Sequence, residues 1–342
     1  MVASNASDLR QRRQRSSSTV SAIADAATAA EQKVTSALLL LWDELPHWRR
    51  DNAFILSGYR PASNSYVASF LSTFSVHNES VNIWTQSASR HHSLSSWDFT
   101  ICRCSPFYIA IGSLILVPLA VLYFYTEIAP RYPSANSTDE LVFACFLCGA
   151  ALCLGMSATF HALSNHSEIV AKWGNKLDYS GIVCLIVGSY VPALYYGLFC
   201  KSVLLSLYLY AIFLLGLGCG IVSWVEHFRT PSWRPYRATM FVGLGVSGVI
   251  PVCHGLMMYG YRSLNERMGL NWVLFQGALY IFGAILYAVR WPERTSPGTF
   301  DIWGHSHQLF HILILLAAAS HLKGMAKAFD YHHSNLGAQC SL

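Results

Sequence analysis

Charged residues are scarce in this chain, since lysine, arginine, aspartate and glutamate make up only 12% of its 342 residues. Soluble domains carry about 25%, and a soluble helical protein needs more charged surface than this chain offers. The sequence also lacks a glycine-rich phosphate-binding loop, and it has no basic run beyond residues 10–15. Its net charge of +5 therefore does not indicate nucleic-acid binding. Residues 1–36 contain no apolar core of a signal peptide, so we expect no cleavable leader.

Long apolar stretches are abundant, and 53% of the residues are hydrophobic. A helix crosses the hydrocarbon core of a bilayer with about 20 apolar residues. Seven stretches reach this length, at residues 107–125, 141–163, 177–198, 203–225, 238–258, 272–289 and 306–322. The sequence therefore predicts an all-α protein with a seven-transmembrane helix bundle, which is a multi-pass integral membrane protein of the plasma membrane or an endomembrane.

The part of the chain before the bundle is polar. Residues 1–44 begin with a serine-rich stretch that we expect to be disordered, and they continue into an amphipathic, alanine- and leucine-rich helix. Residues 45–105 form a pre-membrane segment rich in polar and aromatic residues. Within it, residues 86–104 are polar without a helical apolar stripe, and this atypical insertion is either genuine or an error of the gene model. The membrane domain then covers residues 106–325, and residues 326–342 form a tail.

The positions of lysine and arginine favour a cytosolic N-terminus and a C-terminus outside. The loops that are cytosolic in this orientation hold seven basic residues: Lys172, Lys176, Arg229, Arg234, Arg237, Arg290 and Arg294. The outer loops and tail hold six: Arg131, Lys201, Arg262, Arg267, Lys323 and Lys327. Arg90 and Arg103 precede the first span and add to the inner side, which is also where the pre-membrane segment is expected.

Three histidines are expected at one depth of the membrane. His307 and His311 are four residues apart, so they lie one turn apart on the same helix face, where both can bind one zinc ion. His161 ends the second span, which descends to the side where the seventh span begins. Polar side chains inside a membrane need a partner or a function. The sequence therefore predicts a Zn²⁺ site, and three imidazole ligands leave a fourth position for water, as in catalytic sites.

Two further polar residues are expected beside this site. Asp178 begins the third predicted span on the cytosolic side, where a carboxylate can orient a zinc-bound water or serve as its general base. Ser157 lies one turn before His161 and can hydrogen-bond to a zinc ligand, to the water or to a substrate carbonyl. By contrast, His305 points about 200° away from His307 and is expected at the interface. His321 is expected in the opposite leaflet, away from the zinc.

These motifs resemble the progestin and adipoQ receptor family, which includes adiponectin receptors, fungal zinc-homeostasis proteins and haemolysin III proteins. The resemblance rests on residues 77–85 (HNESVNIWT), on Ser157 and His161 in the second span, on Asp178 within residues 177–182, and on residues 306–311 (SHQLFH). The chain departs from the family pattern after Thr85, where the family runs directly into the first span. The resemblance implies the same orientation, a bound zinc ion and a ceramide-like substrate.

Three functions remain open at this point. The first is a receptor-like protein with zinc-dependent hydrolase activity toward a lipid amide of the ceramide type, in which Asp178 handles the proton. The second is a receptor in which zinc is purely structural and ties two helices together. The third is a regulator of zinc or sterol homeostasis without catalysis, although a transport path should place ligands at several depths. The expected partners are membrane lipids, either ceramide-like or sterol, and an extracellular protein ligand, but no nucleic acid; the oligomeric state stays open.

Overall fold

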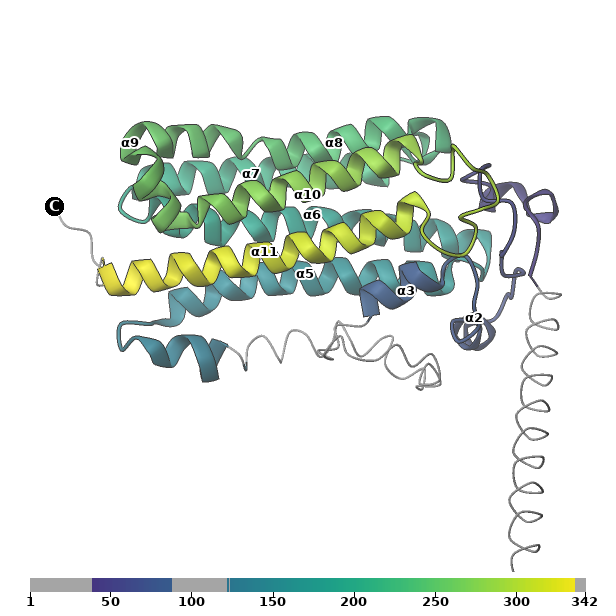
Figure 1. Cartoon of the computed structure of the whole chain (residues 1–342), viewed down its shortest axis with the longest axis horizontal. Helices are drawn as coiled ribbons and strands as arrows, with labels where there is room; N and C mark the ends of the chain where they lie inside the picture. Colours follow the sequence, from purple (N-terminus) through teal and green to yellow (C-terminus); the bar gives the residue numbers. More distant parts are fainter. Residues whose placement is uncertain (1–38, 88–121, 123, 336–342) are drawn as a thin grey trace, which may run out of the picture.

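The computed structural model describes residues 39–87, 122 and 124–335 (Figure 1). The expected disordered segment, the insertion beyond residue 87, most of the first predicted span and the last seven residues lie outside the described part. Within that part, every regular element is a helix, and the only β-pairing is an isolated bridge between Leu40 and Tyr59.

Six candidate membrane spans are present among the described residues. They are α5 (Ser137–Leu163), α6 (Glu168–Leu198), α7 (Ser202–Trp224), α8 (Arg234–Val246) continued by α9 (Val249–Met268), α10 (Leu270–Val289) and α11 (Ser306–Asn335). The helices run side by side along the long axis of the molecule (Figure 1). Their length and apolar composition make the chain an integral, multi-pass membrane protein, which confirms the all-helical prediction for the second to seventh spans.

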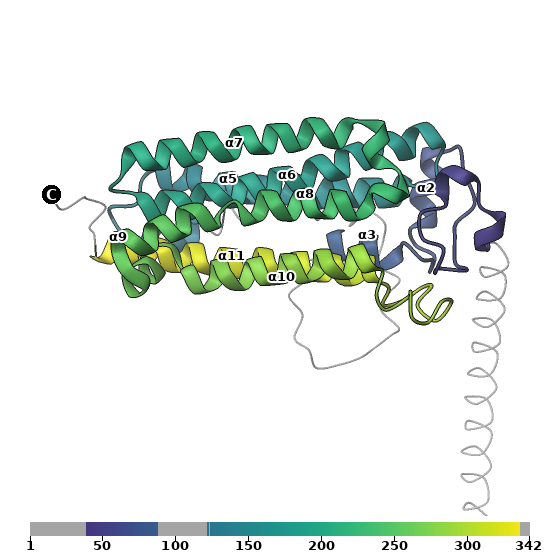
Figure 2. The same ribbon diagram turned by 90° about the horizontal axis from the view of Figure 1, so that it is seen from above.

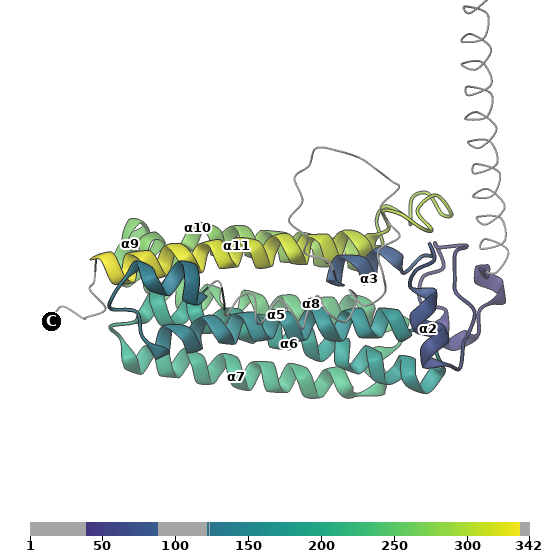
Figure 3. The same cartoon turned by 90° about the horizontal axis from the view of Figure 1, so that it is seen from below.

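The bundle has two distinct ends. We call the end where α5 and α10 finish and α6 and α11 begin the site end, and the opposite one the distal end. Viewed from above, α7 lies at one edge of the bundle, and α10 and α11 lie at the other (Figure 2). Two short helices of the pre-membrane segment, α2 (Tyr66–Ser72) and α3 (Ser80–Ser87), pack at the site end, and α3 lies against both α5 and α11 (Figure 3). The pre-membrane segment therefore covers this end of the bundle.

Short helical turns make up the other regular elements of the described chain. They are η1 (Trp42–Glu44), η2 (His47–Arg49), η4 (Phe124–Ile128), η5 (Ala129–Arg131), η6 (Glu226–Arg229) and η7 (Pro231–Trp233). Phe124 packs against Phe143 of α5 and Phe329 of α11, with ring centroids 5.2 and 6.2 Å away. Because both partners lie in the distal halves of their helices, η4 belongs to the distal end.

Several helices extend beyond the predicted apolar stretches. α6 begins at Glu168 instead of residue 177, because charged residues of its first turns are stable at the bundle surface, where Lys172 pairs with Glu168. α11 continues to Asn335 instead of residue 322 because its last turns remain buried, including Phe329 and His332. The fifth span is longer than residues 238–258 and is divided between α8 and α9. Hydropathy marks the apolar centre of each helix but not its polar, packed ends.

α5 and α6 approach closely because glycines line their contact. A Cβ atom at Gly149 would lie 2.6 Å from the carbonyl oxygen of Cys184, and one at Gly188 would lie 2.6 Å from that of Cys145. Small residues allow the backbones of membrane helices to come this near to each other. This close packing fixes the position of His161 on α5 relative to Asp178 on α6.

Candidate metal centre

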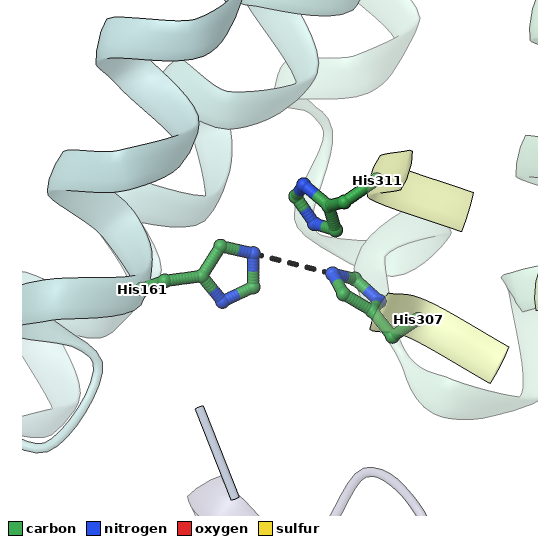
Figure 4. Close-up of side chains that lie close together, drawn as sticks. All are labelled: His161, His307 and His311. Carbon is green, nitrogen blue, oxygen red and sulfur yellow. Dashed lines mark hydrogen bonds between the residues drawn. The ribbon is translucent and has the colours of Figure 1, made fainter. Parts of the chain in front are cut away.

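Three histidines from two helices meet at the site end. His161 comes from α5, while His307 and His311 come from α11, and one ring nitrogen from each lies within 4.8 Å of those of the other two. Figure 4 shows the ring of His161 facing the other two across the gap between the helices. The Nε2 atoms of His161 and His307 are 3.2 Å apart. The predicted clustering of these side chains, separated by up to 150 positions in the sequence, is confirmed.

The chemistry of this cluster fits a metal ion. His311 is 3% exposed, and neither of its ring nitrogens makes a hydrogen bond to another described residue. An unpaired polar group in the protein interior carries a desolvation penalty. A cation bound between the three rings would pair with the lone electron pairs of all three imidazoles at once. His161, His307 and His311 could therefore hold one metal ion, and neutral imidazole is a preferred ligand of Zn²⁺.

Glu79, which was not predicted to be a site residue, orients the first of these ligands. Its Oε2 atom lies 2.8 Å from Nδ1 of His161, and it also accepts a hydrogen bond of 2.6 Å from Asn82. Burial alone would raise the pKa of this carboxyl, but the charge and hydrogen bond of His161 lower the pKa well below its ordinary value. A carboxylate behind a ligating histidine fixes the tautomer and leaves Nε2 free for the metal.

Arg60 holds the end of α5 that carries His161. Its guanidinium donates hydrogen bonds of 2.6 Å to the carbonyl of His161 and 3.0 Å to that of Ala162, and it also reaches Ser72. These carbonyls belong to the last turn of the helix, where no amide of the same helix can pair with them. Burial lowers the pKa of Arg60 to about 10, so the guanidinium still carries its proton at neutral pH. Arg60 therefore caps α5 beside the metal cluster.

Glu293 caps the first turn of α11, as Arg60 caps the last turn of α5. Its carboxylate accepts hydrogen bonds from the backbone amide and the hydroxyl of Ser306, the first residue of the helix, and from Asn52 at 3.0 Å. A negative charge at a helix N-terminus is favoured by the helix dipole. His305, which was predicted to lie at the interface, is instead buried and hydrogen-bonds to the carbonyl of Asn78, because the pre-membrane segment covers it.

Asp178 and Ser157 line the same cavity as His307 and His311. The cavity has a volume of about 500 Å³ and is bounded mainly by apolar side chains of α6, α8, α9, α10 and α11. The Ser157 hydroxyl is buried and interacts with the Asp178 carboxyl. The structure thus brings both predicted residues to the cavity that the histidines also face.

His321 and His254 lie away from the cluster, which for His321 was predicted. His321 bonds to Gln276 in the distal half of the bundle, and His254 pairs with the hydroxyl of Tyr208. At the distal end of α6, Tyr196 is 1% exposed and donates its hydroxyl to Asp139.

Comparison with known proteins agrees with this architecture. The sequence pattern of the haemolysin-III-related family matches residues 74–322. The chain is 41% identical to ADIPOR-like receptor IZH2 of Saccharomyces cerevisiae over 310 residues, covering 91% of this chain and 90% of the relative. It is 40% identical to the adiponectin receptor protein of Drosophila melanogaster, covering 90% of this chain and 64% of the relative.

A plant relative extends the comparison. Heptahelical transmembrane protein 4 of Arabidopsis thaliana is 32% identical, with 83% of this chain and 86% of the relative covered. The family match includes α3, the described membrane helices as far as residue 322 of α11, and all three clustered histidines. This extent of similarity, together with the helical membrane architecture, shows that the chain belongs to the haemolysin-III-related family, which includes adiponectin receptor-like proteins.

Proposed function

We propose that this protein is a receptor-like, zinc-dependent lipid amide hydrolase that acts on a ceramide-like membrane lipid. One observation carries the proposal: two histidines of the three-histidine cluster line an apolar cavity whose wall also presents a carboxylate and a hydroxyl. The cavity suits the hydrocarbon chain of a lipid, and the polar residues at the site end suit its amide. The ceramide class follows from the family resemblance.

Each residue has a distinct task in this proposal. His161, His307 and His311 would hold the zinc, with His161 oriented by Glu79. Bound zinc supplies Lewis acidity that polarises a carbonyl and makes water more acidic. Asp178 accepts the proton of the attacking water and returns it to the amine that leaves. Ser157, which lines the cavity beside Asp178, donates a hydrogen bond to the substrate carbonyl.

The main alternative is a receptor in which zinc is structural. The names of the fungal and insect relatives favour it, since both are called receptors. A metal bound to His161 and His311 would tie α5 to α11, and a ligand could shift this packing. Asp178 would then only position other groups. A zinc transporter has less support, because the described residues contain a single cluster of three potential ligands and transport needs further sites along a path.

Substitution of Asp178 separates the two leading functions. Asp178→Asn keeps the size of the side chain but cannot accept a proton, and loss of a general base costs about 10²–10⁴-fold in rate. We expect this variant to keep its zinc and lose lipid amide hydrolysis by that factor, while the exposed control Asp43→Asn keeps full activity. Ser157→Ala should cost less, since no proton transfer is removed.

Two results would contradict parts of this function. If the zinc-loaded wild type shows no chelator-sensitive hydrolysis of any ceramide-like lipid, the proposed hydrolase function is wrong. The receptor with structural zinc is then the better supported function. If hydrolysis occurs but is unaffected by Asp178→Asn, the chemistry stands and Asp178 is not the base.

We also propose a seventh span and a cytosolic N-terminus. Residues 39–87 lie at the site end, whereas Phe124 packs at the distal end. The described residues on either side of this stretch thus lie at opposite ends of the bundle, which supports a crossing before α5. Glycosylation reporters fused to the two termini test the orientation: the C-terminal reporter should be modified and the N-terminal one should not, and the reverse pattern would overturn the assignment.

A further inference from the structure

The short helix α2 of the pre-membrane segment turns its polar face toward the protein and its apolar face outward. Ser69 and Thr73 are fully buried, and the Ser69 hydroxyl lies 2.6 Å from that of Ser63. By contrast, Val67 and Leu71 are 67% and 56% exposed. An amphipathic helix on the surface of a soluble domain has the opposite arrangement. The outward face of α2 therefore fits an apolar environment and not water.

The exposed surface around α2 carries no charge. Residues 61–76 contain no lysine, arginine, aspartate or glutamate. Protein surfaces in contact with water normally mix charges of both signs, whereas contiguous apolar patches mark binding sites for proteins or membranes. We define the apolar face of α2 as the exposed large apolar side chains of this stretch, which are Tyr66, Val67, Leu71, Phe74 and Val76.

Hydrogen bonds on the buried side of α2 fix the direction of this face. Arg60 donates a hydrogen bond of 2.8 Å to the hydroxyl of Ser72, and the same guanidinium bonds to the carbonyl of His161 at the end of α5. The apolar face cannot turn toward the bundle without breaking the bond to Ser72. The polar contacts of α2 with the protein therefore require its apolar face to point outward.

α2 packs beside the turn that joins α5 to α6. The backbone amide of Ser63, just before α2, donates a hydrogen bond of 2.9 Å to the carbonyl of Asn165 in this turn. The ring centroids of Tyr66, the first residue of α2, and of His166 are 4.2 Å apart. These contacts place α2 at the height where α5 ends and α6 begins.

An exposed apolar stripe on α6 leads from this turn toward the bilayer. Ile169, Trp173 and Leu177 are exposed and follow one another at intervals of four residues, so they lie on one face of the helix. Tryptophan is enriched where the membrane meets water. His166, which contacts α2, lies about 10 Å from Trp173 along the helix axis. Interfacial helices insert their apolar face about 5–10 Å into the boundary between headgroups and acyl chains, so α2 lies within reach of lipid.

We propose that α2 is an interfacial membrane helix whose apolar face binds the lipids of the leaflet at the site end. α2 lies crosswise to the long helices that span the membrane (Figures 1 and 3), which is the orientation of a helix in the plane of the interface. The apolar stripe on α6 makes the apolar face of α2 continuous with the lipid-facing surface. The bilayer is therefore the occupant of this face, in preference to a second copy of the chain or another protein.

Collisional quenching tests this contact. A fluorophore is attached to Val67→Cys in the full-length protein, which is reconstituted into phosphatidylcholine vesicles with or without lipids that carry a nitroxide near the headgroup end of the acyl chain. The signal of the wild type, labelled in the same way, is subtracted. We expect the nitroxide to quench this label as strongly as one at Leu207→Cys, on the exposed face of α7. Aqueous iodide on both sides of the membrane should quench it several-fold less than a label at Asp43→Cys, which is exposed at the site end.

A charge on the apolar face shows whether this face causes the contact. Leu71→Asp should remove most of the nitroxide quenching of the Val67 label and raise its quenching by iodide, because a carboxylate among acyl chains is costly. Ser65→Asp is the matched control, since it adds the same charge at the N-cap of the same helix, where aspartate is as favourable as serine. Both quenching values should stay unchanged in this control. If Leu71→Asp does not fold, the label in the otherwise native protein decides alone.

The proposal is wrong if iodide quenches the label at Val67 as strongly as the label at Asp43, because the apolar face would then contact water. It is also wrong if neither quencher reaches the Val67 label, since a second copy of the chain or another protein would then cover this face. These outcomes do not depend on zinc or on hydrolysis. A protein without hydrolase activity could still confirm the interfacial helix, and an active hydrolase could refute it.

Discussion

Glu79→Gln tests whether the pre-membrane segment increases the affinity of the histidine cluster for zinc. The substitution keeps the shape of the side chain and removes the negative charge that lies 2.8 Å from Nδ1 of His161. A carboxylate behind a ligating histidine typically contributes 10- to 100-fold to metal affinity. The Glu79 side chain is 26% exposed, so solvent screens part of its charge. We therefore expect the lower part of this range, with zinc bound about tenfold more weakly.

The assay is a competition titration of the purified protein against a chromophoric zinc chelator. Glu168→Gln is the matched control, because it removes a glutamate at the same end of the bundle that forms an ion pair with the exposed Lys172. Exposed ion pairs contribute little, so this variant should bind zinc like the wild type. If Glu79→Gln also binds zinc like the wild type, His161 does not depend on Glu79 and our description of its orientation is wrong.

Two predictions concern the scaffold of the site. Gly149→Ala would place a methyl group 2.6 Å from a backbone carbonyl of α6, so it should destabilise the protein by about 1–3 kcal/mol, whereas Gly243→Ala, which meets nothing within 4 Å, should be neutral or slightly stabilising in a thermal melt. Equal melting temperatures for these two variants would refute the close packing of α5 and α6. Arg60→Met should lower stability by about 2–4 kcal/mol, because it removes the charged donor that bonds to two terminal carbonyls of α5, of which that of His161 keeps only the bond from Ser164. The exposed control Arg262→Met should not change the melting temperature, and a similar loss in both variants would contradict the capping role.

The parts of the fold that depend on local hydropathy and residue spacing could be predicted from the sequence. Hydropathy located the centres of the six described spans, and the spacing of His307 and His311 placed them on one helix face. Their meeting with His161 followed from membrane topology, which forces the end of one span and the start of another to the same depth. The zinc itself stays a prediction, because the structure gives the ligand geometry and not the ion.

The supporting residues could not be identified in the same way. Glu79 contacts His161 across 82 positions, and Asn52 contacts Glu293 across 241. Such pairs depend on how the pre-membrane segment folds over the bundle, and no periodicity in the sequence encodes that arrangement. The only available signal was a glutamate in a polar segment directly before the membrane. The burial of His305 was missed for the same reason.

The most direct test of the central claim is the metal content of the purified protein. The wild type and the exposed control His47→Ala should each carry about one zinc per chain. His161→Ala, His307→Ala and His311→Ala should each lose most of it, because two imidazoles hold zinc weakly. Full zinc occupancy in all three variants, or a wild type without bound metal, would contradict the assignment of this cluster as a metal centre.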